Sequence, residues 1–356
     1  MSGLPIRHKP SVPRVAVIPE RYGNVFSPCA SIRLHSFFDR MRRAGEANVR
    51  FLIPSEVEAW RPDVIVWQRV SLADVDKVGR MCEIAARLGA RTIYDLDDNL
   101  LDMDEHRERD AYVDMVAAVR ESVRCADEVW CSTPNLARRV AREGRGRITV
   151  MPNALDPELW ELDRSRASST GSNALRLLYM GTRTHDDDYA FLSKVMDTLH
   201  RASPGAFELH LVGVRTDDSV SPPWLRVHSP PWFVGASYPA FVHWLIGQEG
   251  FDLGVAPLMS GEFNDCKSPI KVLDYAAIGL ATVASAVPAY THSLRSDVNC
   301  FHAPNQVDAW VASLAALVAR PVLVEAVRRN SADLCGSAVF DAAVKARATR
   351  VCQLAG

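Results

Sequence analysis

An acidic stretch, TIYDLDDNLLD at residues 92–102, carries the first group of side chains that could do chemistry. Four carboxylates, Asp95, Asp97, Asp98 and Asp102, follow an apolar run. An aspartate in this setting can act as a nucleophile, and a D-x-D pair can hold a divalent ion. Alternatively, the carboxylates mark the polar end of a buried strand and the start of the next helix. The choice depends on the elements that surround the stretch.

A second segment, NDCKSPIKVLDYAAIGLATVAS at residues 264–285, places cations and a carboxylate at the start of a predicted helix. Lys267 and Lys271 are four residues apart, and Asp274 lies one turn further on. A helix start offers unpaired N–H groups and a positive dipole end, which suits a diphosphate. The carboxylate can accept two hydroxyl hydrogen bonds, as a ribose requires. The other interpretation is a surface helix on which Lys271 and Asp274 pair.

The elements around these segments alternate between short β-branched runs and longer amphipathic runs. This alternation predicts parallel sheets covered on both faces. The polar, serine-rich segment 161–174 interrupts it and is typical of a linker. We therefore expect two Rossmann-like α/β domains, 1–160 and 175–340, facing each other across a cleft, and a C-terminal helix, 341–356, that can pack back on the first domain. The expected strands are 14–18, 48–53, 63–67, 91–96, 128–132, 148–152, 175–181, 207–213, 225–231, 251–258, 281–285 and 299–304.

Bulk properties narrow the function classes. The 356 residues carry a net charge of −2, which gives no electrostatic case for a nucleic-acid binder. The eight cysteines form no C-x-x-C motif, so we interpret them as reduced core residues of a cytoplasmic protein. No apolar run approaches the ~20 residues that a membrane span needs. The basic helix SIRLHSFFDRMRRAG can rest on anionic lipid at the inner membrane face, although a solvated helix face is favoured.

Three ordered motifs resemble one known family. KSPIKVLDYAAIGLATVAS resembles the signature K-x-x-E-Y-x-A-x-G-x-P-V-V-A-S of retaining GT-B glycosyltransferases of family 4. VMPNALDPELW resembles that family's V-x-P-N-G-V-D-x-x-x-F, which lies where the first domain gives way to the second. LRLLYMGTRTHDDDYAFL resembles the opening strand of its nucleotide-sugar domain. The resemblance covers roughly residues 125 to 330, and over the first 120 residues it is topological.

This resemblance implies roles on the donor side. Asp274 takes the place of the family's second Glu, which bonds the ribose. Lys271 and Arg183 are the cations expected on the diphosphate, where they stabilise the leaving group and so act as the catalytic residues. Further donor-binding residues are expected among Gly181, Thr182, Asn264, Lys267 and Ser268.

One residue departs from the family pattern. The position of the first Glu is occupied by Cys266. A contact to the donor sugar then has to come from Asn264 or Asp265, or it is absent. The departure bears on the choice of donor sugar more than on the reaction.

The acidic stretch also resembles the D-x-D-x-T signature of haloacid-dehalogenase-type phosphatases, but its context disagrees. It follows the fourth predicted strand instead of the first, and Asn99 replaces the threonine. We expect Asp97 and Asp98 to face the acceptor, either binding its hydroxyls or orienting His106. Equally, the two carboxylates can simply lie in the loop and cap the start of the next helix. Arg33, one turn into the first helix, is a further acceptor-side residue able to approach a phosphate.

A last polar cluster, His185 with Asp186, Asp187 and Asp188, can be read as a metal site or as the charged first turn of a helix. The helix start is favoured. Enzymes that the chain resembles stabilise the diphosphate with side chains and helix dipoles, so we expect neither a metal nor another cofactor.

The sequence thus predicts a retaining GT-B glycosyltransferase with a UDP-, GDP- or dTDP-sugar donor and a glycan or lipid-linked hydroxyl acceptor, active in polysaccharide or glycolipid assembly. A non-catalytic nucleotide-sugar-binding or scaffold protein of the same fold is the alternative, and a phosphatase is the third. Neither the base nor the oligomeric state can be read from the sequence.

Overall fold

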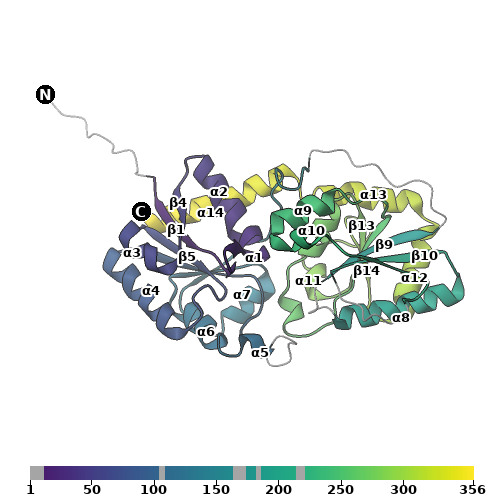
Figure 1. The fold of residues 1–356 in the computed structure, drawn as a ribbon, viewed down its shortest axis with the longest axis horizontal. Coiled ribbons are helices and arrows are strands. Elements are labelled where there is room, and N and C mark those ends of the chain that lie inside the picture. Colours follow the sequence, from purple (N-terminus) through teal and green to yellow (C-terminus); the bar gives the residue numbers. More distant parts are fainter. Residues whose placement is uncertain (1–11, 104–108, 163–173, 182–185, 214–220) are drawn as a thin grey trace.

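The structure, a computed structural model, describes residues 12–103, 109–162, 174–181, 186–213 and 221–356. Within these ranges the chain forms two α/β domains, each built on a six-stranded parallel sheet (Figure 1). Each of the twelve expected strand runs overlaps one of these strands. The runs of central strands such as β5 and β12 are apolar because those strands are buried on both faces of a sheet.

The N-terminal sheet has the strand order β4-β1-β5-β6-β7-β8. Its strands are β1 (Arg14–Ile18), β4 (Asn48–Phe51), β5 (Val64–Gln68), β6 (Arg91–Leu96), β7 (Glu128–Cys131) and β8 (Arg147–Val150). A short hairpin, β2 (Arg21–Tyr22) and β3 (Val25–Phe26), follows β1 and was not expected. The helices around the sheet are α1 (Pro28–Ala30), the π-helix η1 (Ser31–His35), α2 (Ser36–Arg43), η2 (Pro54–Glu56), α3 (Val57–Trp60), α4 (Val75–Leu88), α5 (Arg109–Tyr112), α6 (Val116–Cys125) and α7 (Pro134–Val140).

The C-terminal sheet has the order β11-β10-β9-β12-β13-β14. Its strands are β9 (Leu175–Met180), β10 (Phe207–Val212), β11 (Leu225–His228), β12 (Leu253–Ala256), β13 (Ala281–Ser285) and β14 (Phe301–Ala303). The accompanying helices are α8 (Asp186–Ala202), η4 (Trp232–Ala236), α9 (Tyr238–Ile246), η5 (Asn264–Cys266), α10 (Ile270–Ala277), α11 (Pro288–Thr291), α12 (Val307–Val318) and α13 (Pro321–Ala332).

Both faces of each sheet carry a hydrophobic core. In β5, Ile65 and Trp67 belong to one cluster and Val64 and Val66 to the other, as the alternation of side chains along a strand requires. The C-terminal sheet is covered on its two faces in the same way. Each domain is therefore built around its own sheet, with a hydrophobic core on each face.

The helices begin and end where local chemistry allows. In α4 the Asp74 side chain accepts a hydrogen bond from the backbone N–H of Lys77 at 2.8 Å, which satisfies one free donor of the first turn. Gly89 ends the helix in the left-handed conformation at φ 67°. In α7 the Thr133 side chain caps the backbone N–H of Leu136 at 3.1 Å, ahead of Pro134.

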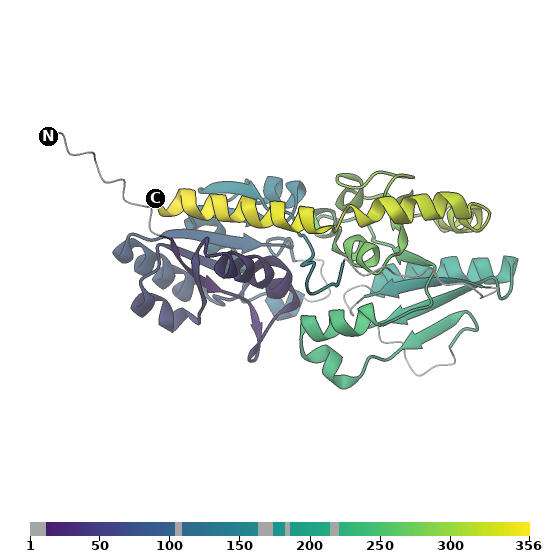
Figure 2. The same ribbon diagram turned by 90° about the horizontal axis from the view of Figure 1, so that it is seen from above.

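The last helix, α14 (Ser337–Ala355), returns to the N-terminal domain, along which it runs in Figures 1 and 2. Phe340 stacks on Phe37 with ring centroids 5.1 Å apart. Arg350 forms an ion pair with the buried Glu128 at 2.5 Å. In the other direction, Leu155 and Trp160 already pack in the core of the C-terminal domain. The chain therefore crosses between the domains twice.

Among the described helices, none is by itself long and apolar enough to cross a membrane. One pair of helical segments in the described ranges, Val307–Val318 and Pro321–Ala355, bent by 100°, passes that test when the two parts are taken together.

Candidate functional site

The strand orders point to the edge of each sheet where a ligand would bind. In an open parallel sheet, ligands bind beyond the carboxyl ends of the strands, at the point where the strand order reverses. In the C-terminal sheet this point lies between β9 and β12, and in the N-terminal sheet between β1 and β5. Of the residues singled out in the sequence, Gly181 follows β9, and Lys271 and Asp274 follow β12. Asp97 and Asp98 follow β6, the strand next to β5.

Helix α10 carries the two residues expected to bind the donor. Lys271 lies in its first turn, and Asp274 one turn further on. The Lys271 Nζ and the Asp274 Oδ1 are both buried, and neither has a hydrogen-bond partner among the described residues. The Lys271 Nζ lies 4.8 Å from the centre of the Tyr179 ring, at the end of β9. Buried polar atoms without partners are costly, so this pair is suited to a polar ligand.

Burial shifts both pKa values toward the neutral forms. It lowers the pKa of the Lys271 ammonium to about 8, although Asp188 and Asp274 act to raise it. It raises the pKa of the Asp274 carboxyl well above its ordinary value, and the charge of Lys271 opposes this only in part. A dianionic diphosphate beside Lys271 would favour the ammonium form. Such perturbed pairs are common at functional sites.

Tyr275 fixes the helix against the switch point. Its hydroxyl accepts a hydrogen bond from the Met180 N–H at 2.9 Å, at the end of β9, and donates to the Val255 carbonyl of β12 at 3.2 Å. Its ring lies against Gly254, where a Cβ atom would approach the ring to 2.5 Å. One side chain therefore ties α10 to both strands that flank the expected ligand position.

The other residues expected to bind the donor do not form one cluster within the described ranges. Gly181 follows β9, and its carbonyl lies so close to Gly213 that a Cβ there would approach it to 2.6 Å. The Asn264 amide donates to the Met259 carbonyl at 2.8 Å, and the Lys267 Nζ lies 5.3 Å from the centre of the Phe263 ring. Arg183, Thr182, His106 and His185 lie outside the described residues.

The three aspartates that follow His185 form the first turn of α8, the position favoured from the sequence. Asp188 is buried and accepts a hydrogen bond from the Met259 N–H at 2.7 Å. No group of three or more His, Cys, Asp or Glu side chains within the described ranges is placed to hold a metal ion.

The segment 262–268 of the C-terminal domain is bound to the N-terminal domain. The Thr133 hydroxyl donates to the Cys266 carbonyl at 2.8 Å, the Asn135 amide to the Asp265 carbonyl at 2.6 Å, and the Asn153 amide to the Ser268 hydroxyl at 2.8 Å. The Cys266 side chain, 6% exposed, packs in a core cluster of the N-terminal domain. The residue that replaces the family's first Glu therefore serves as an anchor between the domains.

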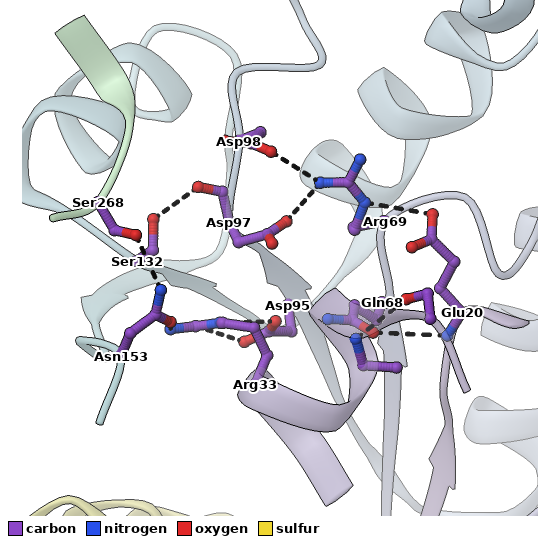
Figure 3. A network of polar contacts seen from close by, with 12 residues as sticks. Glu20, Arg33, Gln68, Arg69, Asp95, Asp97, Asp98, Ser132, Asn153 and Ser268 are labelled. Atoms are coloured by element: carbon purple, nitrogen blue, oxygen red, sulfur yellow. Dashed lines mark hydrogen bonds and ion pairs between the residues drawn. The ribbon is translucent and has the colours of Figure 1, made fainter. Parts of the chain in front are cut away.

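Asp95, the first carboxylate of the acidic stretch, is fully buried. Its two oxygens accept hydrogen bonds from Arg33 Nε at 3.1 Å and Nη2 at 2.6 Å, and both side chains are 0% exposed (Figure 3). Arg33 also donates to the Met151 carbonyl and to the Asn153 side chain, the latter at 3.0 Å. This corrects the expectation that Arg33 approaches a phosphate: it instead holds Asp95 and orients Asn153, which binds Ser268. A buried, doubly bonded Asp95 is equally unsuited to attack phosphorus.

Asp97 and Asp98 converge with Glu20 on a single cation, Arg69 (Figure 3). The ion-pair distances from Arg69 are 2.6 Å to Asp97, 3.2 Å to Asp98 and 3.2 Å to Glu20. Burial acts to raise the pKa of the Asp97 carboxyl, and Arg69 by its charge and hydrogen bond holds it below its ordinary value. The Glu20 Oε2 and the Gln68 Nε2 are buried without hydrogen-bond partners among the described residues. Three carboxylates around one cation leave this edge acidic.

Arg69 and Glu20 were not singled out from the sequence. Arg69 directly follows β5 and Glu20 lies two residues after β1. Arg69 has a φ of 46°, an uncommon conformation for a residue other than glycine. The signal that could have found them is position: in an open parallel sheet, polar residues at the carboxyl ends of the two strands beside the switch point deserve inspection.

The basic helix face is already neutralised by acidic neighbours. Arg40 and Arg43 pair with Glu158 at 2.7 and 2.8 Å, and Arg42 pairs with Asp39 at 2.6 Å. These paired and partly exposed arginines agree with a helix face that lies in solvent, the interpretation that the sequence favoured.

Comparison with known proteins establishes the fold. No protein-family model and no curated protein matches the chain. Among solved structures, HepE of Anabaena in complex with UDP-glucose has a TM-score of 0.62 at 10% identity, with 96% of this chain and 98% of that chain covered. Sucrose-phosphate synthase from Thermosynechococcus elongatus has a TM-score of 0.57 at 12% identity, with 83% and 74% covered. A glycosyltransferase from Rickettsia africae has 0.59 at 8% identity, with 96% and 98% covered. The predicted two-domain GT-B fold is therefore confirmed.

Proposed function

We propose that this chain is a glycosyltransferase that moves a sugar from a nucleoside diphosphate donor to a hydroxyl acceptor, with retention at the anomeric carbon. The observation that carries the proposal is the pair on α10: the amino group of Lys271 and the carboxyl group of Asp274 lie one turn apart, with the Lys271 Nζ and the Asp274 Oδ1 buried, at the switch point of the C-terminal sheet. HepE with UDP-glucose and the pneumococcal O-GlcNAc transferase GtfA with UDP and GlcNAc share the fold, which supports a nucleotide-sugar donor.

In this proposal each donor residue has one task. Lys271, with Arg183, neutralises the charge that develops on the diphosphate as the glycosidic bond breaks. Asp274 accepts hydrogen bonds from the ribose hydroxyls, which fixes the nucleotide and thereby the reacting carbon. Because protein cations take this role, we expect turnover to persist in EDTA. We name no protein nucleophile.

The acceptor side belongs to the N-terminal domain. Asp98 is the most exposed of the three acids around Arg69, with 29% of its side chain accessible, and Asp97 retains 12%. Carboxylates bind hydroxyl groups well and repel phosphates. Two arginines at this edge, Arg33 and Arg69, are already bound to acids. The acceptor group that enters here is therefore a sugar or another neutral polyol. A glycan in polysaccharide or glycolipid assembly fits this chemistry.

A second candidate, a nucleotide-sugar-binding protein without catalysis, is favoured by one observation. The position where the family carries its first Glu holds Cys266, whose side chain points into the other domain's core. Incubation with UDP-, GDP- and dTDP-sugars and neutral glycan acceptors distinguishes the two. Multiple-turnover release of nucleoside diphosphate supports the transferase, and binding without turnover supports the second candidate. The anomeric configuration of the product, measured by NMR, tests retention.

A further inference from the structure

Two cysteines of the N-terminal domain meet across neighbouring helices. Cys82 lies in α4 and Cys125 is the last residue of α6, and their Sγ atoms are 2.8 Å apart. This is shorter than the roughly 3.5–4 Å at which carbon atoms pack. Both are free, and each side chain is partly exposed. A movement of roughly 0.8 Å brings the sulfurs to the ~2.05 Å of a disulfide bond.

The pair borders a cavity of about 420 Å³ at the amino end of β6. Asp95 and its neighbours lie at the opposite, carboxyl end of the same strand. This cavity is therefore separate from the proposed transferase site, and it gives a small molecule a path to the two sulfurs. Its lining includes Cys82, Cys125, Gly89, Arg91, Thr92 and Asp127.

The environments of the two thiols make one of them easier to ionise, so the two differ in their roles in a thiol–disulfide exchange. The hydrogen bond that Cys82 shares with Cys125 lowers the pKa of the Cys82 thiol, against the effect of burial. The same hydrogen bond, together with burial, raises the pKa of the Cys125 thiol. Cys82 is thus the more readily ionised thiol and the better first nucleophile.

We propose that Cys82 and Cys125 are a modification site that forms a reversible intramolecular disulfide by exchange with glutathione disulfide. The Cys82 thiolate attacks one sulfur of glutathione disulfide, whose S–S bond breaks, and one glutathione thiolate leaves. Cys125 then loses its proton to water and attacks the Cys82 sulfur of the mixed disulfide, which releases the second glutathione. In total, two electrons and two protons pass from the cysteine pair to glutathione disulfide, and two molecules of glutathione result.

The bond ties α4 to α6 and closes a loop that contains all of β6. A cross-link of this length restricts the unfolded chain, so it stabilises the domain. The oxidised protein is expected to melt on the order of 5–10 °C above the reduced protein.

The test uses the full chain, first reduced, then incubated with glutathione disulfide and blocked with an alkylating reagent. Digestion with trypsin and a Glu-specific protease separates Cys125, in CADE (125–128), from Cys131, in VWCSTPNLAR (129–138). Mass spectrometry should then find CADE linked to MCE (81–83), and dithiothreitol should abolish both this link and the rise in melting temperature. Cys352→Ser, at the exposed cysteine of α14, should retain both effects, and Cys82→Ser should lose both.

Three results would overturn the proposal: no linked peptide in the wild-type protein, a glutathione adduct on Cys82 that persists, or an equal rise in melting temperature in Cys82→Ser. Should Cys82→Ser fail to fold, the wild-type peptide map decides alone. None of these readouts depends on transferase activity.

Discussion

Lys271 makes nucleotide binding depend on pH in a way that can be calculated. Its pKa in the free protein is lowered to about 8 by burial. A bound diphosphate should return it toward the ordinary value of about 10.4, so binding takes up a proton above pH 8. The charged fraction falls from about nine-tenths at pH 7 to about one-tenth at pH 9. Affinity for the nucleotide is therefore retained below pH 8 and lost as the pH rises through 8. By pH 9 the affinity should have fallen about tenfold, which is about 1.4 kcal/mol.

Calorimetric titration with whichever of UDP, GDP and dTDP binds best, at pH 7, 8 and 9, measures this loss. Lys271→Arg is the matched control, because a guanidinium stays charged over the whole range and its affinity should be flat. Ionisation of the nucleotide base affects both proteins and cancels in the comparison. Lys271→Met should bind weakly at each pH. The reasoning is refuted if the wild-type affinity is constant between pH 7 and 9, or if Lys271→Arg shows the same tenfold loss.

The remaining predictions concern the N-terminal domain and its junction with the second. Asp95→Ala leaves the Arg33 charge buried without a counter-charge, so the free energy of unfolding in urea should fall by about 3–5 kcal/mol, and a loss under about 1 kcal/mol would mean that the pair is not a buried ion pair. Cys266→Glu places a carboxylate against an apolar core cluster and should lower the melting temperature far more than Cys266→Ser does, whereas a gain in turnover of a UDP-sugar would show that this position faces the donor. Asp98→Asn should raise KM for a neutral glycan acceptor and leave the Kd of the nucleotide unchanged, and a changed nucleotide Kd would contradict its place on the acceptor side.

The fold could be predicted because its central strands are buried on both faces. A strand such as β5, VIVWQ, must be apolar at every position that touches a core, and this makes it visible in the sequence. The hairpin Arg21–Phe26 was not predicted, because strands of two residues are too short to show a period.

The site could be predicted only where its residues are neighbours in the chain. Lys271 and Asp274 share one helix turn, so their spacing is a signal in itself. The partner of Asp95 lies 62 residues away, and periodicity carries no information about such a contact. The sequence does not show that Arg33 is buried against Asp95, and for this reason we had expected Arg33 to approach a phosphate. The motif likewise gave the position of Cys266 in the sequence, but not that its side chain packs against the N-terminal domain.

The most direct test of the donor site is the effect of Asp274→Ala on nucleotide binding. Thermal unfolding with UDP, GDP and dTDP, each at saturating concentration, should show stabilisation of the wild-type protein by one of them. Asp308→Ala, at an exposed aspartate of α12 in the same domain, is the control and should be stabilised to the same extent as the wild type. Asp274→Ala should remain folded and lose most of that stabilisation. Equal stabilisation of Asp274→Ala and Asp308→Ala would contradict the assignment of α10 as the nucleotide-sugar site.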